Sequence, residues 1–266
     1  MTIIHPDAPF PRPFPQGAVL LIDKPLGWTS FDAVNKVRYH LSKLVGVKRI
    51  KLGHAGTLDP LATGLLILCA GDYTKRIDEF QQLPKTYEGT ITFGATTPSY
   101  DREKAVDTVF STAEVNDEAL QALIPRFSGA IEQLPPVFSA VRVKGKRLYE
   151  NARSGTEVDI QARSVFIESL EIGPLRPVDA SIREVLILSD KGTTIYQHPE
   201  HPEGLQADFK VRCSKGTYIR SLAYDLGEAL HSGAYLSSLR RTETGGLSVE
   251  DAWEIEALMQ AVVSPH

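Results

Sequence analysis

The chain alternates between short apolar runs and segments with helical periodicity. Ala18–Ile22 and Leu65–Ala70 are continuous aliphatic runs of strand length, so both predict buried strands. Tyr87–Phe93 alternates apolar with polar residues, which is the pattern of a strand with one buried face. Further strands are expected at Val165–Ile172, Glu184–Leu188, Gln206–Ser214 and Ala234–Gly245.

Helical spacing begins after Ser30, a residue type that often caps the N-terminus of a helix. Apolar side chains then recur every three or four positions, at Phe31, Val34, Val37, Leu41 and Leu44. Lys36, Arg38 and Lys43 fall off this stripe and are expected to face solvent or a ligand. Further helices are predicted at Asp72–Gln82, Asn116–Phe127 and Leu148–Arg153, after Thr217, and at Val249–Val262.

Composition narrows the class of protein. An apolar fraction of 42% in 266 residues is enough for a substantial core, in one large domain or two small ones. No run of about twenty apolar residues exists, so no transmembrane helix is predicted. The start lacks the regions of a signal peptide, and its prolines predict an extended arm over residues 1–16. Cys69 and Cys213 lie in apolar strand-like runs, which favours buried thiols. We therefore expect a cytoplasmic protein.

The net charge of −4 argues against a generic nucleic-acid binder, but its distribution matters more than the sum. No acidic residue lies between Asp32 and Asp59, an interval that contains Lys36, Arg38, Lys43, Lys48, Arg49 and Lys51. A second basic cluster, residues 142–147, interleaves with aromatic residues in Pro135–Gly155, a mixture suited to phosphates and stacked bases. Two such segments are compatible with a local phosphate footprint. The alternative is that the first segment is an ordinary solvent-exposed helix face and the second an ordinary hairpin, neither of which contacts RNA.

Gly53–Gly64 (GHAGTLDPLATG) has the clearest chemical character. Its one acid, Asp59, stands directly before Pro60, which restricts the acid to extended or turn conformations. The glycines permit tight or left-handed backbone, and a predicted buried strand follows at once. A carboxylate on such a stiff loop suits a nucleophile or a general base. The alternative is an ordinary turn, because Asp and Gly are the commonest turn residues.

Other candidate residues stand at the ends of predicted elements. Arg220 lies in the first turn of a predicted helix, where a cation is unfavourable for the helix dipole. A carboxylate partner is therefore expected, and Asp59 is a candidate. Lys24 precedes a proline at a strand end, an exposed and rigid place, and its alternative is a surface turn lysine. Tyr87 leads a strand, where a tyrosine is usually a core residue with a hydrated hydroxyl.

Six segments together carry a resemblance to a known family. They are DKPLGWTS, GHAGTLDPLATGLL, KTYEGTITFGATTPSYD, PPVFSAVRVKGKRLYENARSG, CSKGTYIRSLAYDLG and YLSSLRRTETG. In this order they resemble the motifs of the TruB family of tRNA pseudouridine synthases, over nearly the whole chain from Gly17 to about Trp253. The resemblance implies an α/β (α+β) fold with a central mixed, mostly antiparallel sheet, flanking helices and an RNA-gripping thumb insertion at about residues 135–163.

The resemblance also implies an activity and its catalytic residues. Asp59 would be the catalytic aspartate, Tyr87 would stack on the flipped base, and Arg220 would pair with Asp59. The family converts uridine 55 in the T arm of tRNA to pseudouridine, with no cofactor and no metal. A covalent carboxylate intermediate would split one hard step into easier ones.

Substrate-binding positions follow from the same resemblance. Tyr218 and Leu239 would line the base pocket, His54 would occupy the site that the extruded base leaves, and Lys24 would lie close to the active-site wall. The thumb would hold RNA through Lys144, Lys146 and Arg147. We expect tRNA as the partner, a monomer, no obligate protein partner and no membrane contact.

Two departures from the family pattern and two alternatives qualify this picture. After the arm, residues 17–266 are expected to form a single catalytic domain without the C-terminal PUA module of many bacterial members. Residues 175–204 are longer than expected, and Ser189–Gly204 within them predicts an exposed loop or hairpin tip rather than a metal site for His198 and His201. The alternatives are a non-catalytic RNA-binding or tRNA-folding module, and an enzyme of the same family that acts on other RNA within a larger complex.

Overall fold

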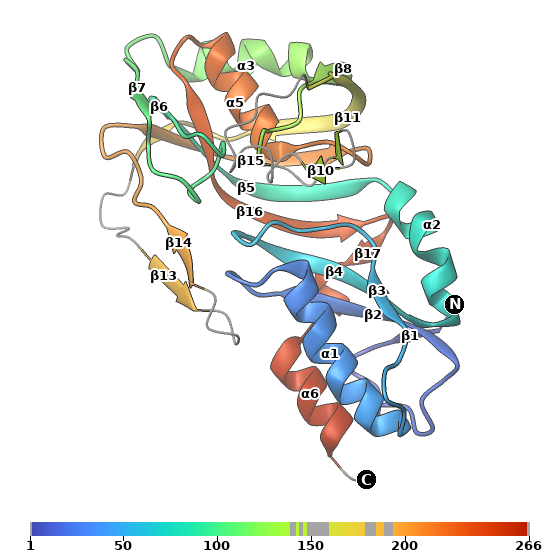
Figure 1. The fold of residues 1–266 in the computed structure, drawn as a ribbon. Coiled ribbons are helices and arrows are strands. Elements are labelled where there is room, and N and C mark those ends of the chain that lie inside the picture. The colour runs from blue at the N-terminus through green and yellow to red at the C-terminus, as the bar shows by residue number, and fades with distance from the viewer. Residues whose placement is uncertain are drawn as a thin grey trace. The chain divides into compact units, whose positions relative to one another are not determined.

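The computed structural model describes residues 2–138, 142–143, 146–147, 160–178, 185–188 and 194–264. The chain divides into two compact units. Unit 1 comprises residues 1–87, 188–193 and 240–266, and unit 2 comprises residues 88–187 and 194–239 (Figure 1). Among the described residues, no helix is long and apolar enough to cross a membrane.

Unit 1 is built on a strand pair from the two longest apolar runs of the N-terminal region. β2 (Gly17–Lys24) lies antiparallel to β4 (Ala62–Gly71) and confirms both predicted strands. β1 (Ile3–Ile4) and β18 (Trp253–Glu254) pair in parallel with β2, and β3 (Leu52–His54) pairs antiparallel with β4. The helical elements are α1 (Ser30–Val45), a 3₁₀ turn at Asp72–Arg76, α2 (Ile77–Gln82), a 3₁₀ turn at Val249–Asp251 and α6 (Ile255–Val263).

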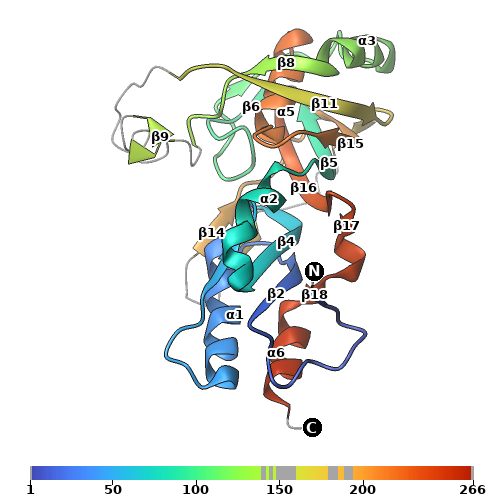
Figure 2. The ribbon, with the colours of Figure 1, turned by 90° about the vertical axis from the view of Figure 1, so that its right-hand side faces the viewer.

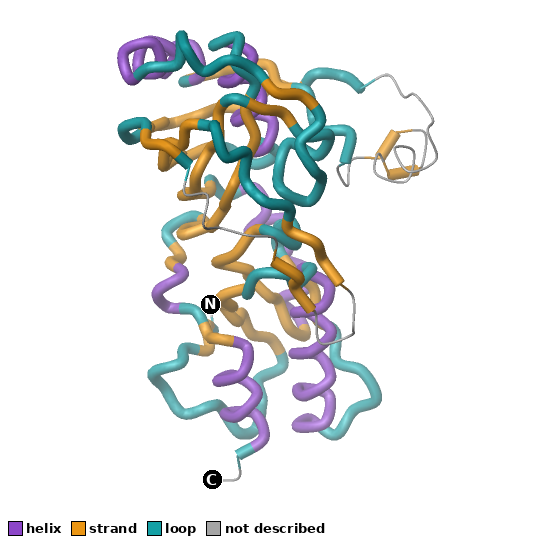
Figure 3. The backbone as a smooth tube through the Cα atoms, turned by 90° about the vertical axis from the view of Figure 1, so that its left-hand side faces the viewer, coloured by secondary structure: helices purple, strands orange, loops and turns teal. Residues whose placement is uncertain are grey.

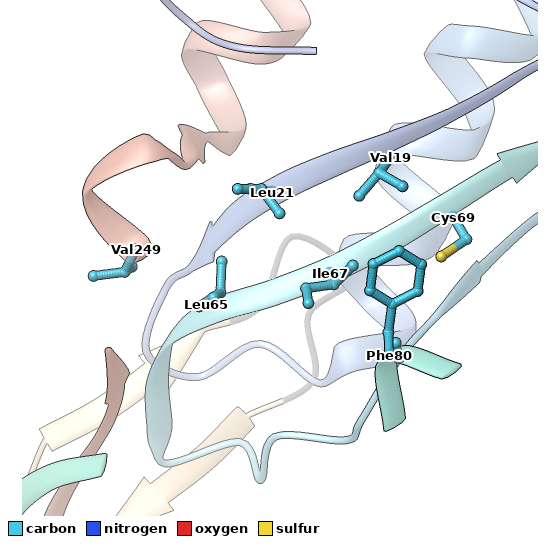
Figure 4. Close-up of a cluster of buried hydrophobic side chains, with 8 residues drawn as sticks. Val19, Leu21, Leu65, Ile67, Cys69, Phe80 and Val249 are labelled. Atoms are coloured by element: carbon cyan, nitrogen blue, oxygen red, sulfur yellow. The ribbon is translucent and has the colours of Figure 1, made fainter. Parts of the chain in front are cut away.

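Both faces of the β2–β4 pair are buried, which explains why these strands are continuously apolar rather than alternating. One face forms a cluster with Phe80 of α2 and Val249 (Figure 4), and its strand members are Val19, Leu21, Leu65, Ile67 and Cys69. The side chains of the opposite face are also fully buried, and α1 and α6 lie side by side in this unit (Figures 1 and 3). Burial also raises the pKa of the Cys69 thiol to about 11, and both cysteines are buried and free.

The predicted N-terminal arm packs onto the last elements of the chain. The Phe10 ring is buried and lies edge-on to Trp253, with centroids 6.4 Å apart, and the Trp253 indole donates to the Ile4 carbonyl at 2.8 Å. The Arg12 guanidinium donates to the Val262 and Ser264 carbonyls at the end of α6. A cation there satisfies terminal carbonyls and complements the helix dipole.

The predicted start of α1 is wrong by one residue. Thr29 is the N-cap, because its hydroxyl accepts from the Asp32 amide while the Asp32 carboxylate accepts from the Thr29 amide. Ser30 is instead buried and bonds elsewhere. Phe31, predicted on the apolar face, is 59% exposed, because the buried stripe of α1 passes through Ser30, Ala33 and Val34 and Phe31 lies to one side of it.

Unit 2 is a largely antiparallel sheet in which β16, β5, β15, β11 and β8 follow one another as neighbours. Figure 2 shows β8, β11 and β15 together. The strands are β5 (Lys85–Phe93), β8 (Gly129–Gln133), β11 (Arg163–Ile172), β12 (Arg176–Pro177), β15 (Leu205–Cys213) and β16 (Ala234–Thr244). The first three residues of β5 and the last five of β16 belong to unit 1. The helices are α3 (Asp117–Leu123), which Asn116 caps as predicted, a 3₁₀ turn at Ile124–Phe127 and α5 (Ile219–Ala229). The predicted mixed, mostly antiparallel α/β fold is confirmed.

The remaining elements are short and include wrong predictions. β6 (Ala95–Thr96) pairs with β7 (Thr108–Val109), β9 (Arg142–Val143) with β10 (Lys146–Arg147), β13 (Val185–Leu188) with β14 (Thr194–Gln197), and β17 (Leu247–Ser248) with β16. The β13–β14 pair forms a hairpin at the predicted loop or hairpin tip, but Gln197 and Glu200 within Ser189–Gly204 are buried rather than exposed, because Glu200 pairs with the buried Arg102. The predicted helix Leu148–Arg153 lies outside the described residues. A single helix over Val249–Val262 was wrong, because Trp253 and Glu254 pair with β2 as β18.

Candidate active site

The loop between β3 and β4 carries Asp59 and is fastened to the beginning of α1. The Ser30 hydroxyl accepts from the Leu58 amide at 2.8 Å and donates to the Leu58 carbonyl at 3.1 Å. The Gly27 amide donates to the Pro60 carbonyl at 2.9 Å. The residues on both sides of Asp59 are therefore held by α1 and by the turn before it. Asp59 itself is half-buried, so a residue whose neighbours are held at the backbone still keeps part of its surface accessible.

Arg241 holds both ends of the same loop from β16. Its side chain is 1% exposed and donates to the Leu65 carbonyl at 2.7 Å and to the Gly56 carbonyl at 3.1 Å. Gly64 makes this approach possible, because a Cβ atom there would lie 2.3 Å from the Arg241 carbonyl oxygen. Gly64 also has φ +99°, a left-handed conformation that disfavours other residues. The glycine-rich motif thus lets a buried guanidinium close the loop.

Lys24 is buried in this region, which corrects the prediction of an exposed lysine at the strand end. Its side chain is 0% exposed, and its ammonium group donates to the Trp28 carbonyl at 2.6 Å and to the Pro25 carbonyl at 2.9 Å. Burial lowers the pKa of Lys24 to about 7, an effect that the negative charge of Asp59 opposes and the positive charge of Arg241 reinforces. Asp59 and Lys24 are therefore electrostatically coupled.

His54 and Tyr87 complete the predicted site residues of unit 1. His54 ends β3, five residues before Asp59, and burial together with the Arg241 charge lowers its pKa. The imidazole is thus neutral at pH 7. Tyr87 belongs to β5 and is half-buried, as expected for a strand tyrosine.

Arg220 has partners within unit 2 that the sequence did not reveal. Its side chain is 5% exposed and donates to the Ser99 carbonyl at 2.9 Å and to the Phe138 carbonyl at 3.0 Å. Its Nε atom lies 3.7 Å from a carboxylate oxygen of the buried Asp101. These contacts explain how an arginine is tolerated in the first turn of α5. Its pairing with Asp59 stays a prediction.

Tyr218 is the N-cap residue of α5, and a buried glutamine sets its backbone. The Gln133 side chain accepts from the Tyr218 amide at 2.7 Å and donates to the Tyr218 carbonyl at 3.0 Å. Leu239 lies in β16 and is half-buried. Of the thumb residues, Lys146 and Arg147 belong to β10, opposite Val143 and Arg142, but their side chains and all of Lys144 lie outside the described residues.

Sequence reasoning missed four residues that build these sites: Ser30, Asp101, Gln133 and Arg241. Arg241 had a partial signal, since it is one of two adjacent arginines in the predicted strand Ala234–Gly245, but Gln133 carried none. Within the described part of the chain, no group of three or more His, Cys, Asp or Glu residues is placed to hold a metal ion. His198 and His201 instead present backbone amides to the Arg102 carbonyl and the Tyr235 hydroxyl.

Comparison with known proteins places this arrangement in a family. A model of the TruB family pseudouridylate synthase N-terminal domain matches residues 42–195, and a model of the tRNA pseudouridylate synthase B C-terminal domain matches residues 220–265. The chain belongs to the TruB family. The predicted family and the predicted pseudouridine synthase class are therefore confirmed.

Several relatives of the TruB family cover nearly the whole chain. A protein of Bacteroides thetaiotaomicron named tRNA pseudouridine synthase B is 48% identical over 243 residues, covering 91% of this chain and 92% of that protein. Proteins of the same name from Flavobacterium johnsoniae and Phocaeicola vulgatus are 47% and 46% identical, each over 92% of this chain and over 96% and 92% of their own lengths.

A solved structure supports the TruB fold. A chain in the crystal structure of an archaeal box H/ACA sRNP Nop10–Cbf5 complex matches with a TM-score of 0.55 at 21% identity. The match covers 91% of this chain and 52% of that chain, so this chain spans about half the length of the solved protein. At this identity the likeness establishes the fold alone.

Proposed function

We propose that the protein converts uridine 55, in the T arm of tRNA, to pseudouridine. The observation that carries the proposal is the fastened loop of unit 1, which presents a single carboxylate, Asp59, beside a buried lysine and a neutral histidine. Membership of the TruB family supports the reaction class, and relatives that bear the name tRNA pseudouridine synthase B support tRNA as the substrate.

The reaction defines what Asp59 must do. The bond between N1 of the base and C1′ of the ribose breaks, a bond between C5 and C1′ forms, and the proton of C5 is lost while N1 gains one. Asp59 can serve as a nucleophile toward the sugar or the base, or as a base that removes a ribose proton. All three roles require an ionised carboxylate. Lys24 is the buried cation that interacts with Asp59 through the coupling described above.

The other site residues take supporting roles in this proposal. Arg220 aims and neutralises the Asp59 carboxylate once RNA is bound, and a guanidinium suits that task because it offers several donors in a fixed plane. Tyr87 stacks on the flipped base, while Tyr218 and Leu239 line its pocket. Stacking compensates part of the unstacking cost of a few kcal/mol. His54 fills the space that the base leaves.

Binding of the T arm is assigned to the thumb. Lys144, Lys146 and Arg147 supply phosphate contacts, which dominate the affinity of most RNA complexes. The protein acts as a monomer on tRNA without an obligate protein partner. Location in the cytoplasm stays a prediction.

Mapping pseudouridine in tRNA tests the proposal. Unmodified tRNA transcripts are incubated with the purified protein, and each pseudouridine is located by chemical modification and primer extension. The expected result is stoichiometric modification at position 55 and at no other uridine. Modification at another position would overturn the site assignment, and the absence of any pseudouridine would overturn the function.

A further inference from the structure

The long region 175–204 is bound to the sheet of unit 2 through a buried glutamate, Glu200. One carboxylate oxygen of Glu200 accepts from the Thr92 hydroxyl of β5 at 3.0 Å. The same oxygen accepts from the Tyr235 and Ser237 hydroxyls of β16 at 2.7 and 3.2 Å. Burial and the negative charge of Glu200 raise the pKa of Tyr235, so the phenol keeps the proton that it donates. These contacts fix the position of the carboxylate.

Arg102 pairs with the other carboxylate oxygen of Glu200. The two groups lie 3.1 Å apart, and their side chains are 5% and 2% exposed. The Nε atom of Arg102 donates to the His198 carbonyl at 2.6 Å, and the His198 amide donates to the Arg102 carbonyl at 2.9 Å. Arg102 is therefore held at its side chain and at its backbone by the short stretch 198–200. Without the carboxylate, a buried guanidinium would lack its countercharge.

Arg102 directly follows the residues that hold Arg220. The Ser99 carbonyl accepts from the Arg220 guanidinium at 2.9 Å, and a carboxylate oxygen of Asp101 lies 3.7 Å from its Nε atom. Tyr100, between these two residues, has φ +61°, a left-handed conformation that costs energy for a residue other than glycine. Strained backbone of this kind persists only where the surrounding structure fixes it. The contacts of Arg102 supply part of that constraint.

We propose that Glu200 is a positioning residue for Arg220 and acts through Arg102. Arg102 fixes the segment 99–101, and this segment holds the Arg220 guanidinium in place. The inference rests on the proposed function, in which Arg220 aims the Asp59 carboxylate. Glu200 lies between the two matched family models, in a stretch that neither of them covers. Because its side chain is buried in unit 2, Glu200 acts without touching the RNA.

Single-turnover pseudouridine formation at saturating tRNA tests the proposal, beside tRNA affinity and urea unfolding of each protein. Glu200→Gln keeps the length of the side chain and removes its charge. Glu168→Gln is the matched control, because it breaks an exposed ion pair with Arg212 in the same unit. A third protein combines Glu200→Gln with Arg102→Met. It removes both buried charges and should therefore regain stability relative to Glu200→Gln alone.

Glu200→Gln is expected to slow the reaction on the order of 10-fold with tRNA binding retained, whereas Glu168→Gln should keep the wild-type rate. The combined variant should regain stability but not rate, because the segment 99–101 still lacks its support. A wild-type rate in Glu200→Gln, or a combined variant that regains rate together with stability, would overturn the proposal. If Glu200→Gln does not fold, the rate of the combined variant decides alone.

A second measurement follows Arg220 without relying on activity. Its Nε–H signal is recorded by heteronuclear NMR and assigned by its disappearance in Arg220→Lys. Glu200→Gln should shift this signal, and Glu168→Gln should not. A signal that stays in place in Glu200→Gln would overturn the proposal. If the wild-type protein forms no pseudouridine but the signal still shifts, the proposed function fails and the positioning of Arg220 by Glu200 stands.

Discussion

Replacing Lys24 with methionine should change the free energy of unfolding by an amount that depends on pH. The folded protein buries this ammonium group against two carbonyls, and burial lowers its pKa from 10.5 to about 7. Unfolding returns the lysine to water. Between pH 7 and 10.5 the unfolded chain therefore binds more protons than the folded chain, and wild-type stability rises with pH across this window. Methionine does not titrate, so the variant lacks this pH dependence of the free energy of unfolding.

The size of the effect follows from the shift. Below pH 7 both states carry the proton, so the disadvantage of wild type is complete and constant. At pH 7 half of the folded molecules have lost the proton, so raising the pH from 7 to 9 returns about 2.3 kcal/mol to wild type relative to the variant, at about 1.36 kcal/mol per full unit. The loss of two hydrogen bonds in Lys24→Met lowers stability at every pH and does not alter this difference.

Urea unfolding of wild type and Lys24→Met in parallel at pH 6, 7, 8 and 9 measures the difference. Lys24→Arg serves as a second variant, because arginine does not deprotonate in this range and should show the same pH-dependent gap. A difference in free energy of unfolding between wild type and variant that stays constant from pH 6 to pH 9 would refute the assignment of a titrating buried lysine. A gap that moves in the opposite direction would mean that Asp59 outweighs burial.

Two further predictions concern the supports of the site. Gly64→Ala should destabilise the protein by at least about 3 kcal/mol, because its Cβ would meet the Arg241 carbonyl. Gly46→Ala, also at positive φ but with open space around it, should cost about 1 kcal/mol. Urea unfolding midpoints compare the two variants, and equal losses of stability would exclude the clash. Asp101→Asn should slow single-turnover pseudouridine formation on the order of 10- to 100-fold, with tRNA binding retained, because Arg220 loses its charged neighbour. An unchanged rate would show that Asp101 does not position Arg220.

Local patterns predicted most elements of the fold. The runs at Ala18–Ile22 and Leu65–Ala70 form strands because both faces of β2 and β4 are covered, which a short continuous apolar run anticipates. Asn116 caps its helix as its side-chain chemistry suggests. Phe31 failed the pattern because the buried stripe of α1 passes through Ser30, Ala33 and Val34, and Phe31 lies to one side of it although its spacing to Val34 is helical.

The site was predicted less completely, since its supports are contacts between distant residues. Asp59 was recognisable from its own loop, yet the hydroxyl that holds Leu58 comes from Ser30, 28 positions earlier. The guanidinium that closes the loop comes from Arg241, 176 positions after Leu65. The burial of Lys24 likewise depends on where the Pro25 and Trp28 carbonyls point after the turn has formed. Spacing alone carries none of this information.

The central claim, that Asp59 performs the chemistry, is tested most directly by Asp59→Asn. This change keeps the size of the side chain and most of its hydrogen bonding but removes its charge. One preparation of the variant is assayed for tRNA binding and for pseudouridine at position 55, beside wild type. The account predicts wild-type-like binding, unchanged or higher stability and pseudouridine at background level. A variant that binds and still turns over within a few-fold of wild type would contradict it.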